Sequence, residues 1–354
     1  MRLSFRHERL SVSAPRAVIF NCAGPVLTAD ERAFFRDADP LGFILFGRNI
    51  ETPQQVHRLV EQLRSSVTRA EAPVLIDQEG GRVARLRPPH WRKAPPARAF
   101  GELYDRDPER GLQAVRLNAH LLGAELAALG VDVDCMPVLD LALPETHDVI
   151  GDRSYGARPE AVAALGRAAA EGLLAEGVMP IMKHMPGHGR ATVDSHHDLP
   201  KVTAARELLE HTDFLPFRLL SDLPWGMTAH LLFEAIDPEV PVTISAHGVK
   251  EVIRGDIGFD GLLVSDDLSM KALGGSLGER AERALAAGCD LGLHCNGRRE
   301  EMEDIVQCTG PLTDAAQRRF QAGRGVLARH RAPLGRAGLA DAARRFAALL
   351  PEWG

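Results

Sequence analysis

The chain has 354 residues, of which 45% are hydrophobic and 25% are charged, and its formal net charge is −6. This composition supports a packed core and argues against global disorder. The acidic balance argues against a general nucleic-acid-binding protein, which usually carries a basic surface.

The beginning of the chain is charged and has no apolar stretch long enough for a signal sequence. Residues 1–15 are therefore predicted to be an N-terminal extension. No apolar run approaches the roughly 20 residues needed to span a bilayer. The five cysteines lack any CxxC spacing and are predicted to be reduced core residues. These features favour a cytoplasmic protein without a membrane partner.

Short apolar runs alternate with longer amphipathic stretches along the rest of the chain. The runs predict strands at residues 17–21, 42–46, 73–77, 132–138, 179–183, 226–230, 261–266 and 291–295. The stretches between them predict helices at residues 53–67, 110–129, 159–176, 205–221 and 277–287. Several of these helices begin at a proline and end at a glycine, as helices commonly do.

The predicted strands are continuously apolar, as expected where helices cover a parallel sheet. About eight strands alternating with helices predict a single-domain α/β fold, a (β/α)8 TIM-like barrel over residues 16–354. A doubly wound open sheet is the alternative. The tail from about residue 313 has a helical pattern and is expected to pack outside the barrel.

Polar residues gather where the predicted strands end. The ends of six strands carry charged or imidazole side chains: Asp77 and Glu79, Asp140, Lys183 and His184, His230, Asp266 and Asp267, and His294. Burying so many such groups separately would be costly. Because barrel enzymes place their catalytic residues at the carboxyl ends of strands, a shared solvated pocket is predicted there.

The segment after the fifth predicted strand reads KHMPGHG at residues 183–189 and continues to Asp194 and His196. Residues two apart in an extended segment project to the same side, so Asp194 can orient His196 for acid–base chemistry. The alternative is that Asp194 caps a turn and His196 is solvated. A glycine-rich loop holds metal ligands poorly, so no metal or other cofactor is expected.

Asp266 and Asp267 are neighbours, so only one of them can face the barrel axis. If Asp266 faces the axis, Asp267 is free to cap a helix that begins near residues 268–270. The opposite assignment stays open, because barrel strands are buried on both faces.

Residues 183–189 with 194–196, together with VSDDLSM at residues 264–270, resemble family 3 glycoside hydrolases. More narrowly, they are similar to the single-domain bacterial β-N-acetylhexosaminidases of the NagZ type. The resemblance runs from about residue 17 to residue 296. It implies a TIM-like barrel and a retaining reaction through a covalent glycosyl-enzyme.

The resemblance also implies a role for each matching residue. Asp266 would be the nucleophile, His196 the acid–base residue and Asp194 its partner. The residues that would hold the N-acetylglucosamine are Asp77, Arg85, Arg153, Lys183 and His184.

The implied activity is that of an exo-β-N-acetylglucosaminidase that removes non-reducing-end N-acetylglucosamine from anhydro-muropeptides in peptidoglycan recycling. The partner would be this small carbohydrate, with no nucleic acid, and the protein is expected to be a monomer. One alternative is a phosphorylase, because a neutral imidazole does not repel an incoming phosphate as a carboxylate would. Another is a sugar-binding barrel that has lost turnover.

Overall fold

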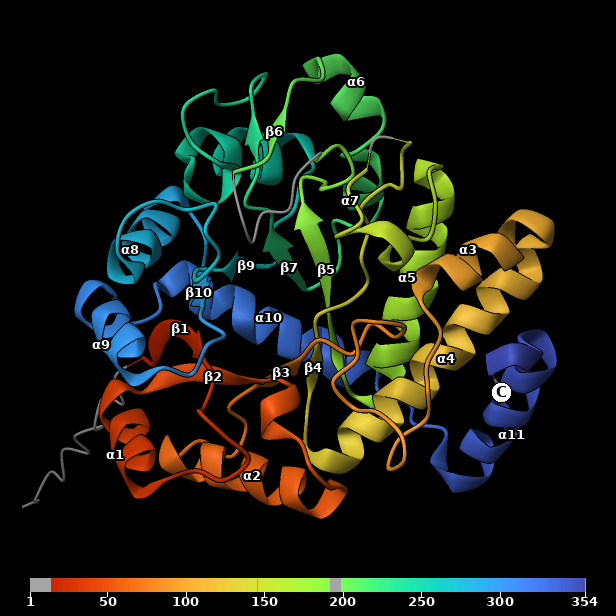
Figure 1. The fold of residues 1–354 in the computed structure, drawn as a ribbon, viewed down its shortest axis with the longest axis horizontal. Helices are drawn as coiled ribbons and strands as arrows, with labels where there is room; N and C mark the ends of the chain where they lie inside the picture. Colours follow the sequence, from red (N-terminus) through yellow and green to blue (C-terminus); the bar gives the residue numbers. More distant parts are fainter. Residues whose placement is uncertain (1–13, 145, 192–198, 354) are drawn as a thin grey trace, which may run out of the picture.

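The computed structural model describes residues 14–144, 146–191 and 199–353. Within these residues eight parallel strands close into a barrel, in the order β1-β10-β9-β7-β5-β4-β3-β2 (Figure 1). The strands are β1 (Arg16–Phe20), β2 (Pro40–Leu45), β3 (Val74–Ile76), β4 (Val133–Asp134), β5 (Met179–Met185), β7 (Trp225–Thr228), β9 (Leu262–Asp267) and β10 (Leu291–Leu293). The predicted (β/α)8 barrel is confirmed, and the pairing of β1 with β10 rules out an open sheet.

Helices surround the barrel (Figure 1). They are α1 (Ala29–Ala38), α2 (Pro53–Ser66), α3 (Ala97–Arg106), α4 (Pro108–Leu129), α5 (Pro159–Glu176), α6 (Arg206–His211), α7 (Leu215–Leu219), α8 (Leu277–Ala287), α9 (Arg299–Cys308), α10 (Asp314–His330) and α11 (Gly335–Leu349). Short 3₁₀ turns lie at Gly47–Asn49, Gly151–Arg153, Val242–Ile244 and Pro351–Trp353, and a π-helix of nine residues spans Gly248–Asp256. A small sheet of β6 (Lys201–Val202) and β8 (Leu232–Phe233) lies outside the barrel.

Local sequence explains where the helices begin and end. The side chain of Thr52 accepts a hydrogen bond from the Gln55 N–H at 3.2 Å, and Pro53 occupies the first turn of α2. Helices α4 and α5 end at Gly130 and Gly177, with φ of 78° and 85°. Glycine adopts this left-handed conformation without steric cost, which lets the chain turn sharply toward the next strand.

Alternate strand residues face opposite sides of the barrel wall. Ile19 and Val264 belong to the cluster that fills the barrel, whereas Phe20 and Leu263 pack in the cluster with the outer helices. Phe320 of α10 joins the interior cluster, where its ring centroid lies 6.0 Å from that of Trp225. Because Trp225 begins β7, helix α10 closes the amino end of the barrel.

Two predicted elements differ most from the structure. The strand predicted at residues 132–138 is regular only over Val133–Asp134, because the Met136 N–H bonds the nearby Asp134 carbonyl oxygen at 2.8 Å instead of a neighbouring strand. The helix predicted at residues 205–221 is two helices, α6 and α7, separated by a break at Thr212. The break turns the next residue, Asp213, inward, where it is 1% exposed and bonds Arg190 Nε at 2.7 Å.

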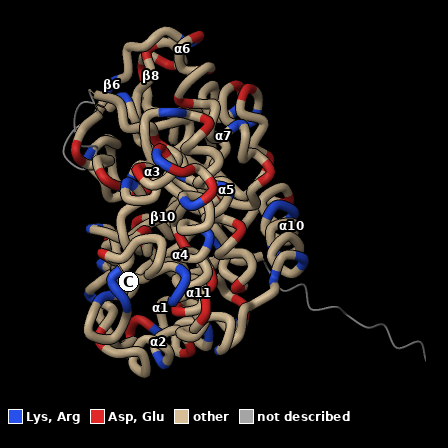
Figure 2. The backbone as a smooth tube through the Cα atoms, turned by 90° about the vertical axis from the view of Figure 1, so that its right-hand side faces the viewer, with Lys and Arg blue, Asp and Glu red and all other residues tan. Residues whose placement is uncertain are grey.

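Basic and acidic residues are interspersed over the outer elements (Figure 2). Among the described residues, none of the helices combines the length and the apolar character that crossing a bilayer requires.

Candidate active site

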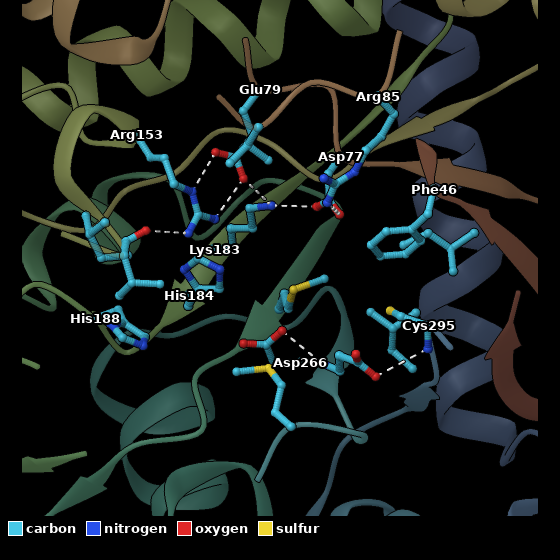
Figure 3. Close-up of a pocket in the computed structure, with 18 of the residues that line it drawn as sticks. Phe46, Asp77, Glu79, Arg85, Arg153, Lys183, His184, His188, Asp266 and Cys295 are labelled. Carbon is cyan, nitrogen blue, oxygen red and sulfur yellow. Dashed lines mark hydrogen bonds and ion pairs between the residues drawn. The ribbon is translucent and has the colours of Figure 1, made fainter. Parts of the chain in front are cut away.

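A cavity of about 310 Å³ lies at the carboxyl ends of the barrel strands. Its wall carries Phe46 after β2, Asp77 and Glu79 after β3, Arg153 from the β4–α5 connection, and Lys183 of β5. The other lining residues labelled in Figure 3 are Arg85, His184, His188, Asp266 and Cys295. Residues separated by more than 200 positions in the sequence thus meet in one pocket.

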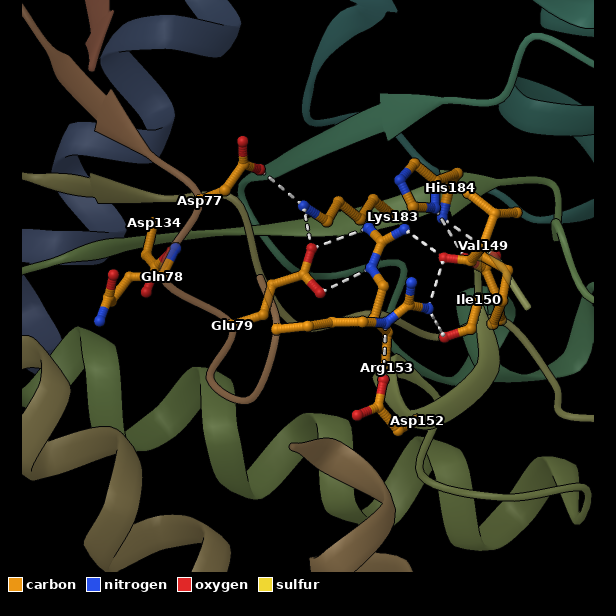
Figure 4. Close-up of polar contacts among 12 residues, drawn as sticks. Asp77, Gln78, Glu79, Asp134, Val149, Ile150, Asp152, Arg153, Lys183 and His184 are labelled. Carbon is orange, nitrogen blue, oxygen red and sulfur yellow. Dashed lines mark hydrogen bonds and ion pairs between the residues drawn. The ribbon is translucent and has the colours of Figure 1, made fainter. Parts of the chain in front are cut away.

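One wall of the pocket is a chain of alternating charges (Figures 3 and 4). Arg85 Nη2 lies 2.9 Å from Asp77 Oδ2, and Asp77 Oδ1 lies 2.9 Å from Lys183 Nζ. Lys183 Nζ also lies 2.7 Å from Glu79 Oε1. Glu79 in turn accepts two hydrogen bonds from Arg153, from Nε and from Nη2, each of 2.8 Å.

The cations in this wall keep its carboxylates ionised. Burial raises the pKa of Glu79, but the charges of Arg153 and Lys183 outweigh burial and lower it to about 2. Burial likewise raises the pKa of Asp77, and Lys183 and Arg85 lower it by more. Burial lowers the pKa of Lys183, whereas Asp77 and Glu79 raise it, with a net upward shift. All three side chains are therefore charged at neutral pH, which suits them to bind hydroxyl and amide groups.

The loop after β3 is held by Gln78, which is fully buried. Its Oε1 accepts hydrogen bonds from the N–H groups of Arg85 and Leu86 at 2.8 and 2.9 Å, and its own N–H donates to Asp134 Oδ1 at 2.9 Å. Gly80 has a φ of +100°, and a Cβ there would lie 2.2 Å from the carbonyl oxygen of Pro95. The glycine lets this loop turn back and bring Arg85 to Asp77.

His184 is oriented by a buried carboxylate. Its Nδ1 lies 2.7 Å from Asp140 Oδ2, while Asp140 Oδ1 accepts hydrogen bonds from the N–H groups of His184 and His188 at 3.2 and 2.7 Å. Burial raises the pKa of Asp140, but His184 and His188 together outweigh burial and the pKa falls to about 2. Burial lowers the pKa of His188 to about 4, so this imidazole is neutral at physiological pH.

Asp266 faces the pocket, and Asp267 takes a different role. Asp267 Oδ1 accepts hydrogen bonds from the N–H groups of Ser269 and Cys295 at 3.0 and 3.2 Å, and its Oδ2 bonds Ser269 Oγ at 2.6 Å. These contacts close a turn, whereas the next helix, α8, begins only at Leu277. The expected helix near residues 268–270 is therefore wrong, although Asp267 does act as a cap.

The carboxylate of Asp266 has its own orienting contact. Its Oδ1 accepts a hydrogen bond from the N–H of Asp267 at 2.8 Å. Burial raises the pKa of Asp266, but nearby His184 and this N–H contribute to a net decrease. The group is thus ionised at neutral pH and can act as a nucleophile.

Six of the eight site residues singled out from the sequence line this pocket: Asp77, Arg85, Arg153, Lys183, His184 and Asp266. Asp194 and His196 lie outside the described residues. His230 and His294, which also end predicted strands, do not line the pocket. His294 is 1% exposed, and its ring stands edge-on to Phe20.

Two residues of the site carried no assigned role in the sequence analysis. Glu79 links Lys183 to Arg153, and Asp140 holds His184. Both are acidic residues just after a predicted strand, which is the signal of a role that the sequence offers. Among the residues that the structure describes, no three His, Cys, Asp or Glu side chains are grouped as metal ligands would be.

The chain is similar in sequence to proteins of one known family. Residues 26–322 match the family described as "Glycosyl hydrolase family 3 N terminal domain". The chain is 41% identical over 277 residues to a "Beta-hexosaminidase" of Alkalilimnicola ehrlichii, covering 77% of this chain and 78% of the relative. It is 38% identical over 288 residues to a "Beta-hexosaminidase" of Pseudomonas aeruginosa, covering 80% and 83%.

Solved structures of similar architecture are also found. NagZ from Neisseria gonorrhoeae, in complex with N-trifluoroacetyl-D-glucosamine, superposes with a TM-score of 0.84 at 32% identity, covering 95% of this chain and 98% of that one. A family 3 β-N-acetylglucosaminidase from Paenibacillus has a TM-score of 0.77 at 34% identity, covering 94% of this chain and 61% of that one.

Proposed function

The chain belongs to glycosyl hydrolase family 3, and we propose that it is a retaining exo-β-N-acetylglucosaminidase that works through a covalent ester on Asp266. The observation that carries the proposal is the ionised Asp266 carboxylate, which faces a 310 Å³ pocket lined by the charged wall. A cavity of this size suits one sugar ring at the end of a substrate chain.

The proposed reaction has two steps. In the first, an oxygen of Asp266 attacks the anomeric carbon, and the bond from that carbon to the leaving oxygen breaks while His196 gives the leaving oxygen a proton. In the second, His196 takes a proton from water, whose oxygen attacks the same carbon and releases the Asp266 carboxylate. Asp194 orients His196 throughout. These two roles rest on the sequence resemblance.

The charged wall binds the sugar in this proposal. Asp77 accepts hydrogen bonds from hydroxyl groups, while Arg85, Arg153 and Lys183 donate to hydroxyl and acetamido oxygens. His184, fixed by Asp140, adds a donor of defined direction. Many such contacts orient the ring and help to distort it toward the transition state.

Two comparisons support the choice of sugar. The relatives at 38–41% identity are named β-hexosaminidases, and the gonococcal neighbour was crystallised with N-trifluoroacetyl-D-glucosamine. We extend this to non-reducing-end N-acetylglucosamine of anhydro-muropeptides, cleaved by a cytoplasmic monomer in peptidoglycan recycling.

The test is direct. Purified protein should release 4-nitrophenol from 4-nitrophenyl β-N-acetylglucosaminide, and Asp266→Ala should lose nearly all turnover while keeping its fold. A 5-fluoro glycosyl inhibitor should label the peptide that contains Asp266, as located by mass spectrometry. No release from this substrate or from a muropeptide would refute the proposal. Product analysis with added inorganic phosphate separates hydrolysis from phosphorolysis.

A further inference from the structure

A buried chain of polar side chains lies behind Asp266, away from the pocket. It consists of Thr228 at the end of β7, His230 just beyond it, and Thr243 in the turn Val242–Ile244, and each is 0% exposed. None of the three lines the pocket. We call this trio the β9 clamp, because both of its ends bond the backbone of β9.

The contacts of the clamp are continuous. His230 Nε2 lies 3.1 Å from the carbonyl oxygen of Asp267, and His230 Nδ1 lies 2.8 Å from Thr243 Oγ1. Thr243 Oγ1 lies 2.8 Å from Thr228 Oγ1, which accepts a hydrogen bond from the N–H of Asp266 at 3.3 Å. The clamp therefore reaches the backbone on both sides of the Asp266 side chain.

The chemistry of each partner sets the direction of these hydrogen bonds. A carbonyl oxygen only accepts, so His230 Nε2 carries a hydrogen toward Asp267. Burial lowers the pKa of His230, which leaves the ring neutral and makes Nδ1 an acceptor. Thr243 then donates to Nδ1, and Thr228 donates to Thr243. The oxygen of Thr228 is left to accept from Asp266, as the geometry requires.

A second acceptor near the Thr243 hydroxyl links the protonation state of His230 to the hydrogen-bond order. Thr243 Oγ1 also lies 3.0 Å from the carbonyl oxygen of Ala229. A doubly protonated His230 would donate from both nitrogens, and the single hydroxyl hydrogen of Thr243 would then go to Ala229 or to Thr228. The two protonation states of His230 thus imply opposite directions for the bond to Thr243, and only the neutral ring gives the hydrogen-bond order described above.

We propose that His230, Thr243 and Thr228 are positioning residues that fix the β9 backbone around Asp266 and so aim its carboxylate at the pocket. The link to the carboxylate is the Asp267 N–H, which bonds Asp266 Oδ1 at 2.8 Å. A shift of this peptide group would turn the carboxylate away from its attack position. The proposal rests on the proposed function, in which Asp266 is the nucleophile.

The kinetic test uses variants at Thr243. Thr243→Val keeps the shape of the side chain but removes its hydroxyl. It should lower kcat for 4-nitrophenyl β-N-acetylglucosaminide by about 10-fold or more, because misplacing a reacting group slows the chemical step. KM should stay within about twofold. Thr243→Ser restores the hydroxyl and should restore kcat to within about threefold. The matched control is Thr309→Val, which removes a buried hydroxyl that bonds Ile305 O at 2.8 Å in α9, outside the pocket; its kcat should not change.

Two kinetic outcomes would overturn the proposal: a normal kcat in Thr243→Val, or a Thr243→Ser variant as slow as Thr243→Val. If Thr243→Val does not fold, the Thr228→Val and Thr228→Ser pair makes the same test, because Thr228 is the residue that bonds Asp266.

A second measurement does not depend on activity. In protein labelled with ¹⁵N-histidine, the NMR signals missing from a His230→Gln variant belong to His230. At pH 7 they should show a neutral ring protonated at Nε2, and a ring protonated at Nδ1 or at both nitrogens would overturn the clamp. If the wild-type protein has no glycosidase activity, or Asp266→Ala keeps normal rates, the proposed function fails and this spectrum alone decides the clamp.

Discussion

The carboxylate of Glu79 meets the guanidinium of Arg153 through two hydrogen bonds, each 2.8 Å long. The same carboxylate lies 2.7 Å from Lys183 Nζ, so one acidic side chain holds two cations of the pocket wall. Bidentate pairs of this kind are strong and fix geometry as well as energy. Glu79 thus determines where two of the proposed sugar-binding groups stand.

Glu79→Gln should therefore weaken substrate binding. The amide offers one acceptor oxygen instead of two and removes the charge that balances Arg153 and Lys183. KM should rise about 10- to 100-fold, as expected when charge-assisted hydrogen bonds worth about 1.5–3 kcal/mol are lost. Glu176→Gln is the control, because this buried acid pairs with His120 at 2.8 Å outside the pocket. It should lose stability with an unchanged KM, and a Glu79→Gln variant with the same behaviour would show that Glu79 is only structural.

Asp140→Asn should act through His184. The amide cannot match the carboxylate that lies 2.7 Å from His184 Nδ1 and also accepts two backbone N–H bonds. We expect kcat/KM to fall about 10- to 100-fold, within the range seen when a group that orients a ligand is removed. Steady-state kinetics with circular dichroism as the fold check makes the measurement. A loss no larger than twofold would mean that His184 keeps its orientation without Asp140.

Asp134→Asn should change the pH dependence of stability. Burial raises the pKa of Asp134 to about 8, and its Oδ2 has no hydrogen-bond partner among the residues that the structure describes. Because the folded pKa lies above the unfolded value of about 3.9, the folded state holds the extra proton. Stability is therefore lost as pH rises from about 4 to about 8. Asparagine has no carboxyl group to ionise, so the variant does not lose stability in this way as pH rises.

Urea unfolding at pH 5, 7 and 9 tests this expectation. The free energy of unfolding of Asp134→Asn minus that of the wild type should increase with pH, by at most about 1.4 kcal/mol per pH unit. It should level off above pH 8. Parallel profiles for the two proteins would mean that Asp134 is ionised in the fold.

Arg85→Lys should not be a conservative change. Arg85 bonds Asp77 Oδ2 at 2.9 Å while its guanidinium lies 4.7 Å from the ring centroid of Phe46. A lysine ammonium is compact and cannot reproduce both contacts. KM should rise about 10-fold, which corresponds to about 1.4 kcal/mol. Arg87→Lys is the control, because Arg87 bonds the backbone carbonyls of Ala84 and Arg82, and its KM should stay normal.

Much of this fold follows from sequence because its pattern is regular. Continuous apolar runs such as residues 179–183 and 291–295 mark strands covered by helices, and eight of them predict the closed barrel. The ends of those strands also predict which side chains share the pocket, including Asp77, Lys183 and Asp266. These inferences need only local pattern and the rule that barrel sites lie at carboxyl ends.

Other features depend on partners that are distant in sequence. Asp266 and Asp267 both line the pocket, and they differ in that the Asp267 carboxylate accepts hydrogen bonds from the N–H groups of Cys295 and Ser269. The role of Glu79 appears only when Arg153, 74 residues away, comes to face it. The periodicity of the sequence carries no information about such long-range contacts. The roles of Asp194 and His196 stay predictions from the resemblance.

The placement of α10 has a consequence for how a substrate enters the pocket and how products leave it. Phe320 packs against Trp225 and closes the amino end of the barrel. The charged pocket therefore opens at the opposite, carboxyl end. The end of a substrate that enters such a pocket first lies deepest in it, and therefore leaves last. In the proposed reaction, the cleaved-off remainder of the substrate must leave before the monosaccharide does, so the architecture would set the order of product release.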